Sequence, residues 1–262
     1  MKRIIKNVIM KLIPSFRPQV ANEEQRRLGI CINFRIPTDE PLVALTFDDG
    51  PSEGVNQEYL VSINGTEIYD PQSTRNLLAV LDRHHAKATF FICGEHICAE
   101  GAETLKELHA QGHELGVHCW HHGESVHRMA QPELIDELRR TKKLITELTG
   151  SIPNCMRPPR GETEAVTTQL IFSHTGMRTI LWQETAFDWF PHYTPEQSVA
   201  CIMQTLAPGS IVLLHDIFKK TPETVDLLLN EMEKRGLRST TISDLIQHSH
   251  DISNYMPPPR RD

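Results

Sequence analysis

The chain has 262 residues, of which 39% are apolar and 23% charged, and its net charge is −7. This length allows one large domain or two small ones, with a core that needs no disulfide or metal for its stability. The acidic balance argues against nucleic acid as a partner, because binding nucleic acid needs clustered Lys and Arg, and no apolar run approaches the roughly 18 residues of a membrane span.

The first 14 residues predict a basic amphipathic helix. Apolar side chains from Ile4 to Ile13 recur on one face, Lys and Arg occupy the other, and Pro14 ends the helix. Such a helix can lie on an anionic membrane surface, and packing on the domain's own surface is an equal alternative. Because Lys6 and Lys11 interrupt the apolar stretch, the segment does not resemble a signal peptide. We therefore expect a cytoplasmic protein, and if the helix does bind a membrane, the contact through residues 1–14 would be peripheral.

The body of the chain alternates between short apolar runs and helical patterns. Strands are predicted at 42–47, 87–92, 114–118, 154–157, 179–183, 210–215 and 237–241. Helices are predicted at 74–85, 102–111, 132–148, 163–175, 195–206 and 222–235. This alternation indicates a parallel α/β sheet, open or closed into a barrel. We divide the chain into a lead-in (1–35), one domain (36–248) with an insertion at 52–73, and a tail (249–262).

Two local features complete this outline. In the insertion, Asn64-Gly65 separates two short runs and predicts a β-hairpin. The six cysteines are scattered and form no CxxC pair, so we interpret them as reduced core residues.

Polar residues of reactive types follow the predicted strands. Asp48 and Asp49 end the first, His118 the third, Arg157 the fourth and His215 the sixth, while Asp188 follows the fifth. Because active sites of parallel α/β folds gather at the carboxyl ends of the strands, these side chains are expected at one edge.

The spacing of the histidines suggests a metal site. On a helical turn, His118 and His122 would share a face at i and i+4, and a carboxylate such as Asp49 would complete a His₂Asp set suited to Zn²⁺ or a similar divalent ion. His121 is an alternative ligand that spacing cannot exclude. Taken singly, both signals are weak, because two solvated histidines or a solvated Asp-Gly turn are more common.

Five short motifs carry a more specific signal. They are TFDDGP at 46–51, HCWHH at 118–122, RPPRG at 157–161, Asp188-Trp189, and LLH at 213–215. In this order they resemble the motifs of the polysaccharide deacetylases, also called the NodB-homology group or carbohydrate esterase family 4. The resemblance spans residues 42 to about 244 and implies a distorted (β/α) barrel of seven or eight strands.

The resemblance also implies a role for each matched residue. Asp49, His118 and His122 would bind one divalent metal ion, with Zn²⁺ the first expectation and Co²⁺, Ni²⁺, Fe²⁺ and Mn²⁺ as alternatives. Asp48 would be the general base, oriented by Arg157, and His215 the general acid, supported by Asp188. Trp189 would form a wall of the groove, Leu213 would line the acetyl pocket, and the backbone N–H of Arg160 would bind the oxyanion.

The expected activity is metal-dependent hydrolysis of the N-acetyl group of an amino sugar in an oligo- or polysaccharide or a lipid-linked sugar. Two alternatives stay open: hydrolysis of another C–N bond by a deformylase or cyclic imide or ureide hydrolase, and a glycan-binding module without catalysis. Three residues depart from the family pattern: Cys119 stands for Ser or Thr, Thr185 for Asp, and Arg160 for an aromatic residue. A hairpin at 52–73 would lie over the groove and narrow it toward a short or end-on substrate, unless it is a loop without function.

Overall fold

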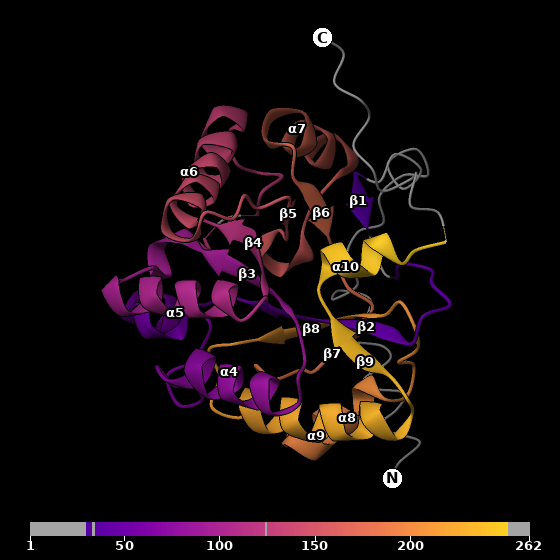
Figure 1. Cartoon of the computed structure of the whole chain (residues 1–262). Coiled ribbons are helices and arrows are strands. Elements are labelled where there is room, and N and C mark those ends of the chain that lie inside the picture. The colour runs from indigo at the N-terminus through magenta and orange to yellow at the C-terminus, as the bar shows by residue number, and fades with distance from the viewer. Residues whose placement is uncertain (1–29, 33–34, 124, 251–262) are drawn as a thin grey trace, which may run out of the picture.

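The computed structural model describes residues 30–32, 35–123 and 125–250. A curled sheet occupies the centre of the molecule (Figure 1), and every strand pair in it is parallel. The strands are β1 (Cys31–Ile32), β2 (Leu42–Asp48), β3 (Thr89–Cys93), β4 (Glu114–Cys119), β5 (Cys155–Met156), β6 (Arg178–Ile180), β7 (Glu184–Thr185), β8 (Ile211–His215) and β9 (Arg238–Thr240). Their order is β1-β6-β5-β4-β3-β2-β8-β7, with β9 beside β2. The predicted parallel α/β fold is confirmed, and the sequence missed only the two-residue strands β1 and β7.

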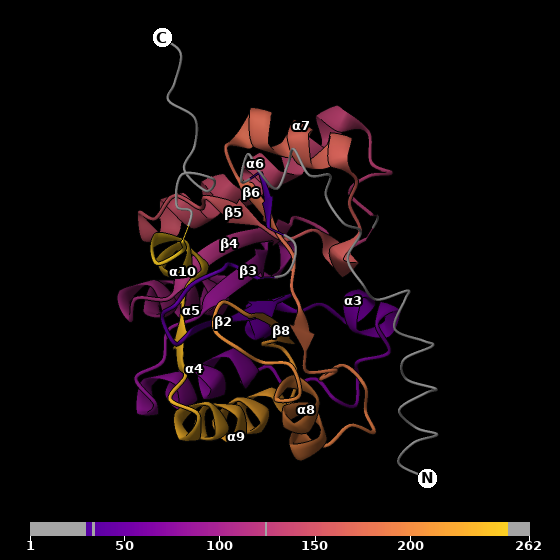
Figure 2. The ribbon, with the colours of Figure 1, turned by 90° about the vertical axis from the view of Figure 1, so that its right-hand side faces the viewer.

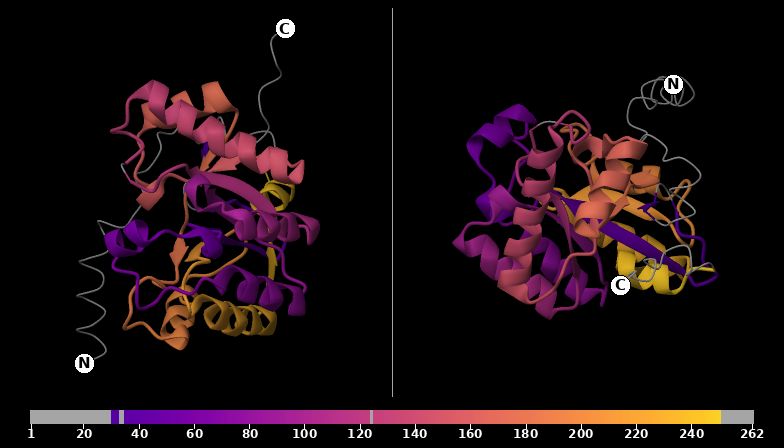
Figure 3. Two further views of the ribbon diagram at one scale, coloured as in Figure 1. Left: turned by 90° about the vertical axis from the view of Figure 1, so that its left-hand side faces the viewer. Right: turned by 90° about the horizontal axis from the view of Figure 1, so that it is seen from above.

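Helices cover the outer side of this sheet. They are α4 (Ser73–Arg83), α5 (Ala99–Ala110), α6 (Gln131–Thr149), α7 (Ala165–Thr175), α8 (Pro195–Ile202) and α9 (Thr221–Lys234). In the order α7, α6, α5, α4, α9 and α8, each packs against the next, so the helices follow the curl of the sheet (Figures 1 and 3). Gly150 and Gly176 end two of them in the left-handed region, with φ of 76° and 71°.

The core has two layers because successive strand residues face opposite sides of the sheet. In β2, Val43, Leu45 and Phe47 belong to the cluster beneath the outer helices. Leu42 and Ala44 belong to the cluster inside the curl, which α10 (Ile242–Gln247) completes. Thr46 and Asp48 follow Leu42 and Ala44 on the same face of β2, the face inside the curl. The alternation that fills the core therefore also places Asp48 on the concave side, at the carboxyl end of the strand.

The predicted hairpin in the insertion is wrong. The segment instead forms a 3₁₀ turn (Ser52–Gly54) and the helix α3 (Gln57–Ser62), which stands apart from the outer helices (Figure 2). Asn64 adopts a left-handed conformation with φ of 52°, and the N–H of Gly65 donates to the carbonyl of Leu60 at 2.8 Å. Asn-Gly therefore ends a helix here. The left-handed conformation that Asn and Gly adopt readily suits a helix end as well as a hairpin turn.

Some predictions fall outside the described residues. The N-terminal helix at 1–14, with its membrane contact, and the end of the tail at 251–262 are among them, so these stay predictions, as does the location of the protein. Among the described helices, none combines the length and apolar character needed to cross a bilayer. All six cysteines are free, and four of them are buried as the core interpretation predicts, whereas Cys98 and Cys201 are only partly buried.

Candidate active site

A cavity of about 370 Å³ opens at the carboxyl ends of the strands. Its walls combine charged groups on the sheet side with apolar and aromatic side chains. They are Asp48, Asp49, Tyr59, Ser62, Ile63, His118, His122, Arg160, Glu162, Trp182, Trp189, Leu213, His215 and Phe218. The strand ends thus converge on one cavity, and eight of the ten site residues predicted from sequence line it directly. The other two, Arg157 and Asp188, lie behind it.

Asp49, His118 and His122 form a compact group of possible metal ligands. One ligand atom from each lies within 4.8 Å of the others, and the three side chains are almost fully enclosed. Asp49 Oδ1 lies 3.3 Å from His118 Nε2 and 3.7 Å from His122 Nε2. Ligand atoms that sit ~2.1 Å from a tetrahedral ion are about 3.4 Å apart, so these spacings suit a divalent metal.

The hydrogen bonds around this group leave its ligand atoms free. His118 Nδ1 lies 2.8 Å from the carbonyl oxygen of Arg157, which can only accept, so Nδ1 is the donor and Nε2 is the nitrogen left to face Asp49. Asp49 Oδ1 is buried and makes no hydrogen bond of acceptable geometry. A buried carboxylate oxygen left in this way between two imidazole nitrogens fits a cation between the three residues.

The ionisation of these ligands also suits a metal. Burial opposes the charged form of Asp49, but the nearby histidines, His122 foremost, hold its pKa well below the usual range. Burial lowers the pKa of His122 to about 4, which keeps the imidazole neutral near pH 7. An ionised Asp49 and a neutral His122 are the forms in which these residues bind a metal.

The choice between His121 and His122 is decided by the backbone. His118 lies in β4 and the following residues form bends, so the two ligands are not on a helical turn as the spacing suggested. The bends turn His122 into the cavity, while His121 points outward and contacts Glu137 of α6 at 2.8 Å. His121 is therefore not a member of the ligand group.

Asp48 is held by the fully buried guanidinium of Arg157. Arg157 Nη1 donates to Asp48 Oδ1 at 2.9 Å and to the hydroxyl of Thr46 at 2.7 Å. Its Nε and Nη2 donate to the carbonyls of Ile180 and Leu181, and its Cζ lies over the ring of Phe91, 4.4 Å from the centroid. Because Arg157 has no exposed surface, its partners fix it in place and it in turn fixes the orientation of Asp48.

Two of the departures from the family pattern find local explanations. Thr185 stands where the family has an acid, yet each nitrogen of the Arg157 guanidinium already donates to Asp48, Thr46 or a backbone carbonyl. Cys119 is buried, and its sulfur lies 3.4 Å from the sulfur of Cys93 on the neighbouring strand. It packs as a thiol behind the ligand group and is not a member of it.

His215 and Asp188 form a second polar pair. His215 Nδ1 lies 2.9 Å from Asp188 Oδ1, and Asp188 Oδ2 accepts the backbone N–H of His215 at 2.7 Å. Burial works against the charged imidazole, but the charge and hydrogen bond of Asp188 outweigh it and raise the pKa of His215 to about 9. With Nδ1 committed to Asp188, Nε2 is the nitrogen that can donate a proton to a bound molecule.

The remaining predicted residues shape the cavity. Leu213 on β8 and Trp189 are part of its wall, and the Trp189 ring meets that of His215 edge-on at 5.2 Å between centroids. Arg160 has a left-handed backbone with φ of 57°, and its side chain donates to the carbonyl of Gly123 at 3.0 Å. Its guanidinium therefore braces the loop after β4 beside the cavity.

Several cavity residues were not predicted as site residues. Trp182 and Phe218 are apolar and carry no chemical signature in the sequence. Tyr59, Ser62 and Ile63 come from α3, so the insertion forms one wall. The position of the insertion, directly after TFDDGP, was the only signal that could have found them.

Comparison with known proteins agrees with this geometry. The family model described as polysaccharide deacetylase matches residues 35–180, and the chain belongs to that family. A peptidoglycan-N-acetylglucosamine deacetylase, PgdA, of Listeria monocytogenes is 32% identical over 78% of this chain and 38% of its own length. A peptidoglycan-N-acetylglucosamine deacetylase of Bacillus cereus is 28% identical over 84% of this chain and 94% of its own length.

A solved structure shares the fold and contains a metal. It is a family 4 acetyl xylan esterase from Clostridium thermocellum in complex with a cobalt ion, 29% identical, with a TM-score of 0.66 over 79% of this chain and 90% of that one. Together with the Asp-His-His group of this chain, it indicates a divalent metal ion as the cofactor. The chain spans less than half the length of the first curated relatives it matches.

Proposed function

We propose that this protein hydrolyses the N-acetyl group of an amino sugar within an oligo- or polysaccharide, with a divalent metal ion bound by Asp49, His118 and His122. The observation that carries the proposal is the convergence, in one cavity, of this ligand group with two differently supported proton-transfer groups, Asp48 and His215. Amide hydrolysis needs an activated water, a stabilised acyl oxygen and a proton for the departing nitrogen, and each need has a candidate group here.

When bound, the ion would polarise both the attacking water and the acyl oxygen. Asp48 lies next to its ligand Asp49 and accepts the proton of the water as general base. The buried guanidinium of Arg157, 2.9 Å from Asp48 Oδ1, keeps this carboxylate oriented. The backbone N–H of Arg160 is the donor that we assign to the negative charge developing on the acyl oxygen.

His215 supplies the proton for the leaving nitrogen. Its pKa of about 9 means that the ring is protonated at neutral pH. Asp188 holds the ring through Nδ1, so the proton on Nε2 is the one transferred. Trp189 and Leu213 line the same cavity and would hold the sugar ring and the acetyl methyl group.

For the metal itself we propose Zn²⁺, which binds two imidazoles and a carboxylate with positions left open in catalytic sites. Co²⁺, Ni²⁺, Fe²⁺ and Mn²⁺ accept the same donor set. The cavity volume of about 370 Å³ falls in the ~300–1,000 Å³ range of small-molecule sites. Substrates named for the relatives, peptidoglycan N-acetylglucosamine and acetylated xylan, define the first panel.

The experiment is acetate release by metal-stripped protein after each metal is added back. N-acetylglucosamine oligomers, peptidoglycan and acetylated xylan are assayed beside an Asp48→Asn variant. We expect metal-dependent release from the N-acetylated substrates, reduced roughly 10²–10⁴-fold in the variant, while metal binding is retained. Release from xylan alone would move the assignment to an esterase.

The other activities considered from the sequence are outcomes of the same assay. A formylated amine and a cyclic imide are included as substrates for a different C–N hydrolase. Glycan binding by the metal-loaded protein without turnover of any substrate would establish a binding module and overturn the proposal.

A further inference from the structure

The insertion reaches the proposed metal site through one side chain. The hydroxyl of Tyr59, on α3, donates a hydrogen bond of 2.5 Å to Asp49 Oδ2. Tyr59 is only 5% exposed, although it belongs to a helix outside the main ring of helices. Since a phenol is protonated at neutral pH and a carboxylate is acceptor only, the direction of this bond is defined.

This contact completes the restraint of Asp49. Its backbone carbonyl oxygen lies 2.6 Å from His96 Nδ1, which must be the donor. With Oδ2 bonded to Tyr59, Oδ1 is the carboxylate oxygen that faces the Nε2 atoms of His118 and His122. Asp49 also has a left-handed φ of 78°, which costs energy for a residue with a side chain and needs surrounding contacts to hold it.

The ring of Tyr59 packs against the second ligand as well. Its centroid lies 5.3 Å from that of His122, with the rings nearly perpendicular, and 4.9 Å from that of His96. No hydrogen-bond partner of His122 Nδ1 is found among the described residues. The edge of Tyr59 therefore restrains an imidazole that lacks the hydrogen bond which fixes His118.

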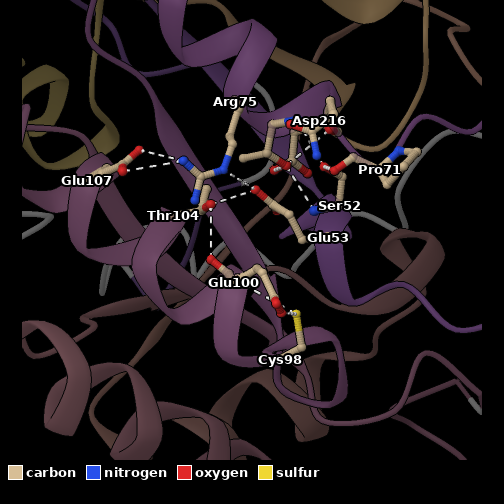
Figure 4. Close-up of polar contacts among 12 residues, drawn as sticks. Ser52, Glu53, Pro71, Arg75, Cys98, Glu100, Thr104, Glu107 and Asp216 are labelled. Atoms are coloured by element: carbon tan, nitrogen blue, oxygen red, sulfur yellow. Dashed lines mark hydrogen bonds and ion pairs between the residues drawn. The ribbon is translucent and has the colours of Figure 1, made fainter.

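The insertion is anchored firmly enough to act in this way. At its root, the Ser52 N–H donates to the Thr74 hydroxyl at 2.9 Å, and the Thr74 N–H donates to the Ser52 hydroxyl at 3.0 Å. Glu53 Oε1 accepts hydrogen bonds from Arg75 Nε at 3.1 Å and from the Thr104 hydroxyl at 2.5 Å. Figure 4 shows these three side chains together. The Asn56 side chain caps α3 by accepting the N–H of Tyr59 itself at 2.8 Å.

We propose that Tyr59 is a positioning residue of the metal site: it commits Asp49 to bind the ion through Oδ1 alone and braces the ring of His122. An insertion that would otherwise be only a wall of the cavity then tunes the strength and geometry of metal binding. Groups that contact metal ligands in this way typically change metal affinity or activity by 10–100-fold when removed. The inference rests on the metal use in the proposed function, and not on the substrate.

The test compares Tyr59→Phe with Tyr69→Phe. Both tyrosines lie in the insertion, but the Tyr69 hydroxyl donates to the Ser52 carbonyl at 2.5 Å, away from the ligands. Metal-stripped proteins are titrated with Co²⁺ against a chromophoric chelator, and the visible absorption spectrum of bound Co²⁺ is recorded. For Tyr59→Phe we expect roughly tenfold weaker binding and altered cobalt bands, because the second oxygen of Asp49 is released.

Neither change is expected in Tyr69→Phe. Wild-type affinity and spectrum in Tyr59→Phe would overturn the proposal. So would equal effects in both variants, or a metal-free Tyr59→Phe that no longer folds by circular dichroism, since these indicate a structural role. The measurement needs no substrate: Co²⁺ binding without deacetylation defeats the proposed function alone, and absence of Co²⁺ binding in the wild type defeats both.

Discussion

Both carboxylate oxygens of Asp188 are bonded to the same residue, His215: Oδ1 lies 2.9 Å from ring Nδ1, and Oδ2 accepts the backbone N–H at 2.7 Å. The hydroxyl of Thr221 adds a third bond, to Oδ2, at 3.1 Å. A single buried acid thus sets the position of β8's last residue, the angle of its ring and the protonation of its imidazole. The charge state of His215 is therefore built into the fold.

The first prediction concerns pH. A group with a pKa raised to about 9 keeps its proton below that pH and loses it above, so kcat/KM should fall on the alkaline side near pH 9. In Asp188→Asn the negative charge that raises the pKa of His215 is gone. That pKa then returns toward ~6.5 or below, since burial favours the neutral ring. At pH 8 the protonated fraction then drops roughly 30-fold.

The measurement is the pH profile of kcat/KM for wild type, Asp188→Asn and Thr221→Val. Thr221→Val removes only the hydroxyl that donates a hydrogen bond to the Asp188 carboxylate, so the alkaline fall of kcat/KM in this variant should stay near pH 9. If kcat/KM of Asp188→Asn fell at the same alkaline pH as in the wild type, His215 would not be the titrating acid.

The second prediction separates two adjacent histidines. His122→Ala should lose stoichiometric metal binding and the stabilisation that metal gives, because only two ligands remain. His121→Ala, which removes an exposed ring that contacts Glu137, should retain both. In the wild type, metal at 100 times its Kd should raise the free energy of unfolding by about 2.7 kcal/mol, measured by urea denaturation with and without metal. Loss of metal in His121→Ala instead would reverse our assignment of the ligand.

The third prediction concerns the buried arginine. Thr46→Val removes an acceptor 2.7 Å from Arg157 Nη1 and leaves that fully buried donor less satisfied, at a cost of roughly 1–3 kcal/mol of unfolding free energy. Thr185→Val should cost less, because the Thr185 hydroxyl only accepts a 3.5 Å contact from the Phe187 N–H. Urea unfolding of the two variants gives the comparison. A larger loss in Thr185→Val would show that position 185 supports the site despite its departure from the family pattern.

Much of the fold follows from local sequence. Buried strands on both faces of a parallel sheet are continuous apolar runs, and the outer helices have one apolar face, so both patterns are readable without tertiary information. The chemistry is readable for a related reason. Asp48, Asp49, His118 and His215 lie at or beside strand ends, and the parallel arrangement brings those ends to one edge.

What the sequence alone could not settle depends on contacts between distant segments. Asn64-Gly65 has the same left-handed preference whether it closes a hairpin or ends α3, and packing of the insertion against the site selects the helix. Spacing alone leaves His121 and His122 equivalent, and the motif resemblance assigned His122; the bends after β4 supply the physical reason, since they turn His122 inward and His121 toward Glu137. Thr46 and Arg157, 111 positions apart, show the same limit: a hydroxyl on β2 accepts a hydrogen bond from a guanidinium that follows β5, and neither segment predicts this contact by itself. Composition and short motifs thus determined which groups this protein has, and the three-dimensional packing decided which of them meet.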